Sequence, residues 1–169
     1  MLGVFSERGR STVNKANSAM TMIQEISFDQ LLPIWRDRLW PNRQSEITPN
    51  SAMVFLGGYD GNNMHTTPAF WSYVLDGTIV GVNSGHMCAD GSYRSRGLWV
   101  DPGHRNQGIG RKLLREAIQT AQNHGASFCW SVPRQQSWPA YQSAGFYLSS
   151  DWFPTETNDS NAYCRVDLA

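Results

Sequence analysis

The chain has 169 residues, of which 40% are hydrophobic and 12% aromatic, and its formal net charge is zero. This composition is typical of one globular domain and excludes a disordered chain. A domain that binds nucleic acid usually carries a basic excess, so the balanced charge disfavours nucleic acid as a partner. The three cysteines are far apart in the sequence, which favours buried thiols in a reducing cytoplasm over a metal site.

The N-terminal segment, residues 1–20, shows neither strand nor helix periodicity, so we predict a disordered tail followed by one domain over residues 21–169. Alternating residues predict a first strand at Met22–Ser27. Apolar residues then recur at helical spacing, which predicts an amphipathic helix that ends at Pro41. A weaker pattern predicts a second, short helix at Gln44–Ile47. No apolar run approaches the length of a membrane span.

The middle of the chain predicts an antiparallel meander of three strands. Two Asp-Gly pairs separate its strands, and such pairs supply the positive φ angles of tight hairpin turns. The strands expected are Ala69–Leu75, Thr78–Ala89 and Tyr93–Val100. The long loop before them, Gly57–Pro68, is either part of a functional pocket or a disordered surface excursion.

The last part of the chain alternates helices and strands. An apolar stripe from Ile109 to Ala121 predicts a helix, and Gly125 is placed to cap it. The elements expected next are a strand at Ser127–Val132, a short helix at Ser137–Ala144, and two strands at Phe146–Trp152 and Asn161–Leu168. This order predicts an α/β fold with a mixed central sheet, in which the antiparallel meander is flanked by helices.

The start of the helix at Ile109 has the character of an anion site. A helix start exposes unpaired N–H groups and the positive end of the helix dipole. Gly108 and Gly110 allow an anion to approach the backbone closely, and basic residues surround them. The segment is not the dinucleotide fingerprint, because Leu113 occupies the place of its third glycine. A lone Gly-x-Gly is also compatible with a turn that only packs a helix on a strand.

Two motifs together resemble the GNAT N-acetyltransferase superfamily. The segment Arg105–Gly110 matches the pattern Gln/Arg-x-x-Gly-x-Gly/Ala of that family, and Tyr141–Phe146 matches its Tyr-x-x-x-Gly-Phe. The preceding Leu98, Val100 and Pro102 also resemble the family. The order of elements is similar from about Thr21 to Leu168. The resemblance implies the GNAT fold, and an enzyme that transfers an acetyl group from acetyl-CoA to an amine in a ternary complex, with no metal.

The resemblance also implies roles for individual residues. The pantetheine arm and the pyrophosphate of coenzyme A would be held by Leu98, Trp99, Val100, Arg105, Asn106, Gln107, Gly108, Ile109, Gly110, Arg111 and Lys112. A backbone N–H near Val100 would polarise the thioester carbonyl. The thioester would enter where the strand that ends at Val100 splays from the next strand. Tyr141 would protonate the departing thiolate as general acid, although it is also compatible with a packed aromatic.

The chain departs from the family pattern at two places. Arg134 stands where many members carry an asparagine that binds the cofactor, which puts that contact in doubt. The third strand of the meander lacks the glutamate that relays the proton of the amine, so the general base is unassigned. His86 is the leading candidate, since histidine titrates near neutral pH, although a lone strand histidine is more often structural. Asp90 and Glu46 are weaker candidates.

The acceptor is expected to be a small-molecule or peptide amine, with no membrane partner, and a homodimer is left open. Arg94 and Arg96 would receive an acidic substrate or, more commonly, form a solvated face. A different reading is a coenzyme A-binding sensor without turnover, which the missing carboxylate favours and Tyr141 opposes. A further alternative is an enzyme of the same fold that acylates a nucleic-acid group, which the balanced charge disfavours.

Overall fold

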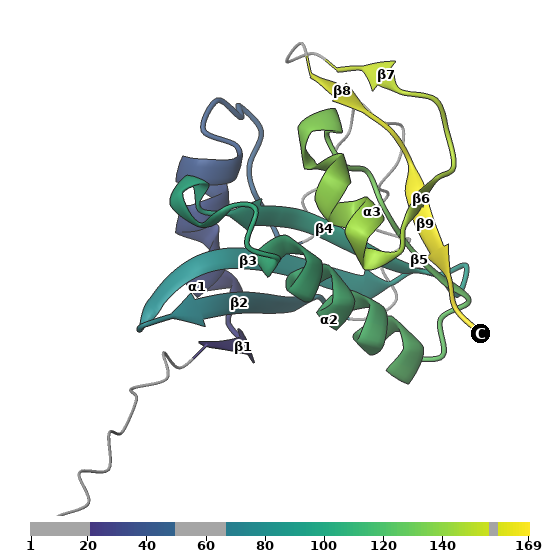
Figure 1. The fold of residues 1–169 in the computed structure, drawn as a ribbon, viewed down its shortest axis with the longest axis horizontal. Coiled ribbons are helices and arrows are strands. Elements are labelled where there is room, and N and C mark those ends of the chain that lie inside the picture. Colours follow the sequence, from purple (N-terminus) through teal and green to yellow (C-terminus); the bar gives the residue numbers. More distant parts are fainter. Residues whose placement is uncertain (1–20, 50–66, 156–158) are drawn as a thin grey trace, which may run out of the picture.

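The computed structural model describes residues 21–49, 67–155 and 159–169 of the chain, so the predicted N-terminal tail and most of the loop before β2 lie outside the described residues. Seven strands form one mixed sheet in the spatial order β1-β2-β3-β4-β5-β9-β6 (Figure 1). These strands are β1 (Thr21–Glu25), β2 (Ala69–Leu75), β3 (Thr78–Met87), β4 (Tyr93–Val100), β5 (Phe128–Ser131), β9 (Cys164–Asp167) and β6 (Tyr147–Leu148). β4 and β5 are parallel, whereas the other neighbouring strands are antiparallel. The predicted α/β fold with a mixed sheet is confirmed.

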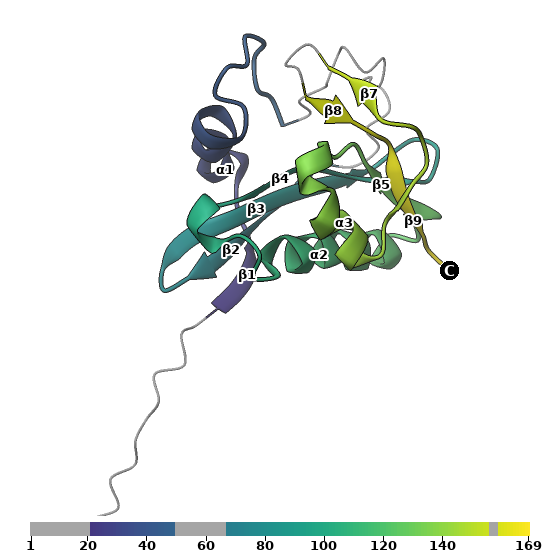
Figure 2. The same cartoon turned by 45° about the horizontal axis from the view of Figure 1, so that its top comes forward.

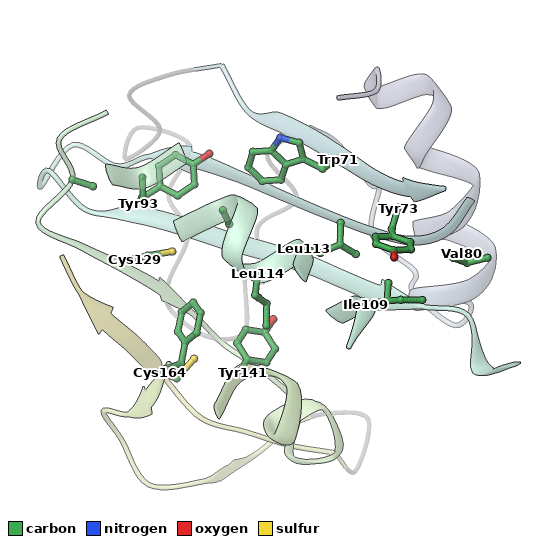
Figure 3. Close-up of a cluster of buried hydrophobic side chains, with 14 residues drawn as sticks. Trp71, Tyr73, Val80, Tyr93, Ile109, Leu113, Leu114, Cys129, Tyr141 and Cys164 are labelled. Carbon is green, nitrogen blue, oxygen red and sulfur yellow. The ribbon is translucent and has the colours of Figure 1, made fainter. Parts of the chain in front are cut away.

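Helices cover both faces of this sheet (Figure 2). α1 (Phe28–Ile34) and the π-helical turn η1 (Trp35–Leu39) lie on one face, and α2 (Ile109–Asn123) and α3 (Trp138–Ala144) lie on the other. The larger apolar core joins the sheet to α2 and α3, and its side chains are drawn in Figure 3. A smaller core joins the sheet to α1 and η1. None of the described helices is both long and apolar enough to cross a membrane.

The two turns of the meander differ, although both contain Asp-Gly. Asp76 and Gly77 have φ angles of 48° and 78°, as the predicted two-residue turn between β2 and β3 requires. In the second turn only Gly91 has a positive φ, 81°. The backbone N–H of Cys88 donates to the carbonyl of Ser92 at 2.8 Å, which closes a longer loop between β3 and β4. The prediction of two identical tight turns is therefore wrong for the second one.

The first predicted helix is present, and its sequence explains where it starts. Ser27 caps α1, because its side chain accepts from the backbone N–H of Gln30 at 3.2 Å while the Gln30 side chain accepts from the Ser27 N–H at 3.0 Å. Pro33 lies inside the helix, and the chain continues from Trp35 as the wider turn η1. This turn brings the fully buried Trp35 side chain against β4.

The predicted short helix at Gln44–Ile47 is wrong, since these residues have no helical structure. The segment lies between two prolines and is tied locally by Arg43, whose side chain donates to the Ser45 hydroxyl at 2.9 Å. A helix of one turn has no packed face to offset the unfavourable nucleation. Local polar contacts therefore decide the path of this segment.

The two long strands predicted at the C-terminal end are replaced by four short ones. β6 and β9 join the main sheet, while β7 (Phe153–Pro154) and β8 (Ser160–Asn161) form a separate two-stranded ribbon. β7 ends at Pro154, which has no N–H to donate to a strand ladder. The first strand is interrupted after Leu148, where the Ser150 hydroxyl accepts from the backbone N–H of Tyr163 at 2.8 Å instead of continuing the ladder.

Candidate active site

β4 carries a bulge at Gly97. In the pairing of β3 with β4, Val82 lies opposite Trp99 and Ser84 lies opposite Arg96, so β4 has one more residue than β3 in this interval. Gly97 has a φ of 72°, which glycine adopts without steric penalty. Because of the extra residue, the side chains of β4 after Gly97 point to the opposite face of the sheet from the one that simple alternation would give them.

Trp35 fixes this bulge from the face that α1 and η1 cover. Its indole N–H donates to the carbonyl oxygen of Gly97 at 2.9 Å. A Cβ at Gly97 would lie 2.3 Å from the Trp35 ring, so the position has no room for a side chain. The first amphipathic helix therefore holds the strand at the point where its backbone changes direction.

Next to the bulge, β4 and β5 part. Their parallel pairing consists of Tyr93 with Cys129 and Arg94 with Trp130, and it stops there. A pocket lies at this separation of the strands. Its lining residues come from the residue after η1, from β4, from the end of β5 and the residue after it, and from α3. They are Trp40, Arg94, Arg96, Gly97, Ser131, Val132 and Tyr141. The splay predicted from the family resemblance therefore has a pocket at its centre.

Tyr141 reaches this pocket from α3, and Figure 3 shows it at the edge of the larger core. The Ser131 hydroxyl donates to the carbonyl of Ser95 at 2.7 Å and lies 3.3 Å from the Tyr141 hydroxyl. Ser131 has a single proton, so it can donate to only one of these two oxygens at a time. Burial raises the pKa of Tyr141, so its hydroxyl carries a proton at neutral pH.

The predicted anion site lies at the start of α2. Asn106 and Gly108 have φ angles of 61° and 79°, and this left-handed backbone leads the chain from η4 (Pro102–His104) into the helix. The Lys112 N–H donates to the Gly108 carbonyl at 3.1 Å, which closes the first helical turn. The N–H groups of residues 109–111 precede that bond, so they are the donors that a helix start leaves for an anion. Arg105, Asn106, Gln107, Arg111 and Lys112 are exposed around them.

The two glycines of the motif have different roles. A Cβ at Gly110 would lie 3.3 Å from the Cβ of Ala140 and 3.7 Å from side-chain carbons of Leu98 and Val100. Gly110 therefore lets α2 approach β4 and α3, which brings the helix start next to the end of β4 and to Tyr141. A Cβ at Gly108 would meet only the Arg111 guanidinium, at 3.6 Å. Gly108 keeps an approach to the backbone open, whereas Gly110 serves packing.

The end of β4 lies between the helix start and the pocket. Leu98 and Val100 pack with the larger core, and Trp99 packs with the core under α1. The carbonyl of Val100 accepts from the Arg105 side chain at 3.1 Å, which ties the loop back to the strand. The predicted cofactor residues therefore follow one another from the end of β4 to the first turn of α2, but Trp99 faces the opposite side of the sheet from Leu98 and Val100.

His86, the predicted base, lies on β3 directly opposite Arg94 but is not among the residues that line the pocket. Its side chain is 1% exposed, and burial lowers its pKa to about 4. Its Nδ1 lies 3.1 Å from the carbonyl oxygen of Met87, which assigns the proton to Nδ1 and leaves Nε2 as the basic nitrogen. His86 is therefore neutral at pH 7.

Arg134, which stands at the place of the family asparagine, joins segments that lie next to the pocket lining in the sequence. Its guanidinium donates to the Leu39 carbonyl at 3.4 Å and lies 3.6 Å from the Asp159 carboxylate. These contacts join the segment after β5 to the end of η1 and to the chain just before β8. They assign Arg134 a structural contribution that its sequence position did not indicate.

The sequence left two explanations for Arg94 and Arg96, and the structure rules out the solvated face. The two residues are 4% and 6% exposed, and both line the pocket. The alternation of β4 points them to the face that carries α1 and η1. Because arginine is seldom buried, the sequence from Tyr93 to Arg96 favours exposure to solvent. The only sequence signal for the burial of these arginines is the aromatic residues elsewhere in the chain that stack on them.

A helix start with open N–H groups, a splayed pair of parallel strands and a buried tyrosine beside the splay are features that an α/β enzyme of the acyltransferase class would need. No group of three or more histidine, cysteine or acidic side chains in the described ranges could hold a metal ion. The sequence matches the model of the acetyltransferase (GNAT) family over residues 28–146. The chain belongs to this family and is an acetyltransferase. A sequence comparison with curated proteins returns no significant match.

Solved structures share this fold. Nourseothricin acetyltransferase is 19% identical with a TM-score of 0.54, and the match covers 60% of this chain and 66% of that one. The ribosomal-protein-S18-alanine N-acetyltransferase of Escherichia coli is 16% identical with a TM-score of 0.60, over 89% and 95% of the two chains. A putative streptothricin acetyltransferase of Bacillus anthracis, in complex with acetyl coenzyme A, is 14% identical with a TM-score of 0.60, over 90% and 100%. At these identities the likeness concerns the fold.

Proposed function

We propose that the chain transfers an acetyl group from acetyl-CoA to an amine by direct attack in a ternary complex. The observation that carries this proposal is the pocket at the separation of β4 and β5, with the Tyr141 hydroxyl on one side of it. The start of α2, the other half of the cofactor surface, meets β4 and α3 at Gly110. An acyl donor and an acceptor that approach from opposite faces of the sheet therefore meet at the pocket between β4 and β5.

The residues present fit coenzyme A at the helix start. The N–H groups of residues 109–111 face an approach that the missing side chain of Gly108 keeps open. Arg111 and Lys112 add positive charge at the first turn, where a helix alone would favour acidic residues. Acetyl-CoA supplies an activated acyl group as a thioester. The chain holds the pyrophosphate at the helix start and directs the pantetheine arm along Leu98–Val100 toward the pocket.

Proton transfer accompanies the exchange of bonds. The amine nitrogen bonds to the carbonyl carbon as the carbon–sulfur bond breaks, and the amine loses one proton. The departing thiolate takes the hydroxyl proton of Tyr141. The Ser131 hydroxyl lies 3.3 Å from that of Tyr141, and the hydrogen bond between them holds the Tyr141 hydroxyl at the pocket. A backbone N–H at the end of β4, near Val100, polarises the carbonyl oxygen.

His86 is the proposed base, acting through Nε2. Its lowered pKa keeps it neutral but makes it a weak base, and its distance from the pocket lining requires a relay. Asp90 is less suited, because its carboxylate accepts from the Ser92 hydroxyl at 2.6 Å and from the Ser92 N–H at 2.9 Å, which lowers its pKa. Glu46 is exposed and does not line the pocket.

The acceptor class is a small-molecule or peptide amine, in line with the acceptors named for nourseothricin acetyltransferase and the S18-alanine enzyme. A cytoplasmic location and a homodimer stay predictions from the sequence. The test is release of free thiol from acetyl-CoA with a panel of amines, polyamines, amino acids and peptides. Acetylation of an amine supports the proposal. Binding of acetyl-CoA without turnover on the whole panel contradicts it and favours the sensor.

A further inference from the structure

The bulge in β4 decides which backbone groups of that strand face β5. Before the bulge, the Ser95 carbonyl accepts from the Ser131 hydroxyl of β5 at 2.7 Å. The next carbonyl, that of Arg96, accepts from the Ser84 hydroxyl of β3 at 2.9 Å. Backbone groups of successive residues in a strand point to alternate sides. Simple alternation from Arg96 would therefore turn the N–H of Val100 toward β3.

After the bulge this alternation is reversed. The Asp101 N–H donates to the Val80 carbonyl of β3 at 2.8 Å, so residue 101 faces β3. Val100 precedes it in an unbroken part of the ladder, and its N–H therefore points away from β3, to the side of β5. The pairing of β4 with β5 ends at Arg94. The bulge thus turns the Val100 N–H toward the separation of the two strands.

Trp35 holds the peptide at which this reversal occurs. Its indole N–H donates to the Gly97 carbonyl at 2.9 Å. A peptide is planar and trans, so the N–H of Leu98 points the opposite way from that carbonyl. Glycine has the widest choice of backbone angles, and Gly97 adopts a φ of 72° here. One hydrogen bond from a side chain therefore fixes the orientation of the whole peptide between Gly97 and Leu98.

The indole itself is fixed by the core under α1 and η1. The Trp35 side chain is fully buried, and its ring packs against Phe28 and Phe70 at centroid distances of 6.4 and 6.0 Å. The Trp40 N–H donates to the Trp35 carbonyl at 2.8 Å, and Trp40 lines the pocket. The donor to Gly97 is therefore in place before any ligand binds, as stabilisation of a developing charge requires.

We propose that Trp35 is a positioning residue for acetyl transfer, because its indole N–H holds the bulge that turns the Val100 N–H toward the thioester carbonyl. This assignment rests on the proposed acetyl transfer and adds a residue of η1 to it. Negative charge grows on the carbonyl oxygen as the amine attacks, and a fixed N–H stabilises that charge. Trp35 is not among the residues that line the pocket, so it acts through the backbone of β4.

The first experiment measures the thioester carbonyl without turnover. Acetyl-CoA labelled with heavy carbon at that carbonyl is bound at saturation, with no acceptor present, and its stretching frequency is recorded by infrared difference spectroscopy. A hydrogen bond weakens the carbonyl double bond, so the frequency should be lower in the parent complex than in free acetyl-CoA. Trp35→Phe should lose most of this shift. Absence of a shift in the parent protein, or an equal shift in the variant, overturns the role of Trp35.

The same measurement separates this role from the proposed function. A shift that depends on Trp35 supports the assignment even if no amine is acetylated, in which case only the proposed acetyl transfer fails. Where an amine is acetylated, the single-turnover rate of Trp35→Phe should be about 10- to 100-fold lower, with acetyl-CoA affinity unchanged. Removing an oxyanion donor outright costs about 10²–10³-fold. A misaligned donor should cost less.

A second variant separates the hydrogen bond from packing, because phenylalanine is smaller than tryptophan in a fully buried site. Replacement of Trp35 by benzothienylalanine keeps the shape of the side chain and exchanges the N–H for sulfur. It should reproduce the loss of the carbonyl shift and of the rate. If only Trp35→Phe shows these losses, packing alone explains them and the assignment is overturned.

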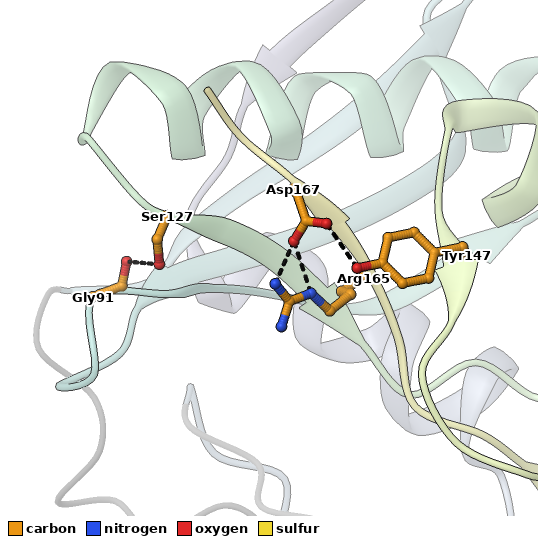
Figure 4. A network of polar contacts seen from close by, with 5 residues as sticks. All are labelled: Gly91, Ser127, Tyr147, Arg165 and Asp167. Carbon is orange, nitrogen blue, oxygen red and sulfur yellow. Dashed lines mark hydrogen bonds and ion pairs between the residues drawn. The ribbon is translucent and has the colours of Figure 1, made fainter.

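Two matched controls remove similar hydrogen bonds elsewhere. Trp130→Phe removes an indole N–H that donates to the Ser92 hydroxyl at 3.0 Å. Ser127→Ala removes a side-chain donor to the carbonyl of Gly91, a glycine with a φ of 81°, at 3.4 Å (Figure 4). Both variants should keep the carbonyl frequency of the parent complex. A loss of the shift in either control equal to that in Trp35→Phe contradicts the assignment.

Discussion

Replacing Gly108 by asparagine separates anion binding from backbone strain. Gly108 has a φ of 79°, and asparagine is the side chain that best tolerates this left-handed region. The new side chain extends into the open approach above the N–H groups of residues 109–111. Loss of one or two charge-assisted hydrogen bonds, at about 1.5–3 kcal/mol each, corresponds to binding that is about 10- to 100-fold weaker or more.

Gly125→Asn is the matched control. Gly125 lies just past the other end of α2, has a φ of 73°, and no atom lies within 4 Å of a Cβ built there. Both variants should lose at most about 1 kcal/mol of stability through the backbone, which lowers the melting temperature by about 2–4 °C for a domain of this size. The control thus reports the strain alone, on the same helix and without an anion site.

Thermal melts with and without acetyl-CoA measure the difference. At 100 times the dissociation constant of the parent protein, acetyl-CoA adds about 2.7 kcal/mol of stability. In a variant that binds 100-fold more weakly, the same concentration adds only about 0.4 kcal/mol. The melting shift should therefore nearly vanish in Gly108→Asn and persist in Gly125→Asn. An undiminished shift in the Gly108 variant would refute the assignment of the helix start as the pyrophosphate site.

Three further predictions concern the bulge, the base and the tail. Gly97→Ala should lower the free energy of unfolding by about 2–5 kcal/mol in denaturant melts, because it adds left-handed strain and a steric clash with the Trp35 ring. A loss below about 1 kcal/mol contradicts the close packing of Trp35 against the bulge. His86 binds its proton more weakly in the folded chain, so stability should fall by up to about 1.4 kcal/mol per pH unit from pH 6.5 down to its pKa of about 4. His86→Gln should flatten that fall, and an unchanged slope refutes the buried neutral state. Deleting residues 2–19 should leave melting temperature and acetyl-CoA affinity unchanged, and a large loss contradicts the predicted tail.

The sequence predicts the elements whose signals are local. The Asp76–Gly77 turn, the amphipathic helix α1 and the apolar stripe of α2 each follow from a few neighbouring residues, and the structure contains all three. The C-terminal strands were predicted poorly, because their ends depend on contacts with β9 and the ribbon rather than on alternation. Tertiary pairing decides such short strands.

Parts of the site could not be predicted because they depend on distant pairs. The contact between Gly97 and Trp35 joins a strand to a helix far earlier in the chain, and neither residue indicates it alone. The hydroxyl contact between Ser131 and Tyr141 depends on the separation of β4 from β5. The burial of Arg94 follows from its stacking on Trp130, which the pattern of β4 does not encode. Sequence reasoning predicts the cofactor loop, which stays a prediction, but it does not reveal that Arg94 and Arg96 are buried.

The measurement that tests acetyl transfer through Tyr141 most directly is a single-turnover rate for Tyr141→Phe with acetyl-CoA and a good acceptor. The substitution keeps the ring and its packing against Phe146, with ring centroids 5.4 Å apart, so folding and acetyl-CoA affinity should barely change. Loss of the proton donor should slow acetyl transfer by about 10²-fold or more, with little change in the Michaelis constant for acetyl-CoA. A single-turnover rate equal to that of the parent protein would contradict the role of Tyr141 as the general acid.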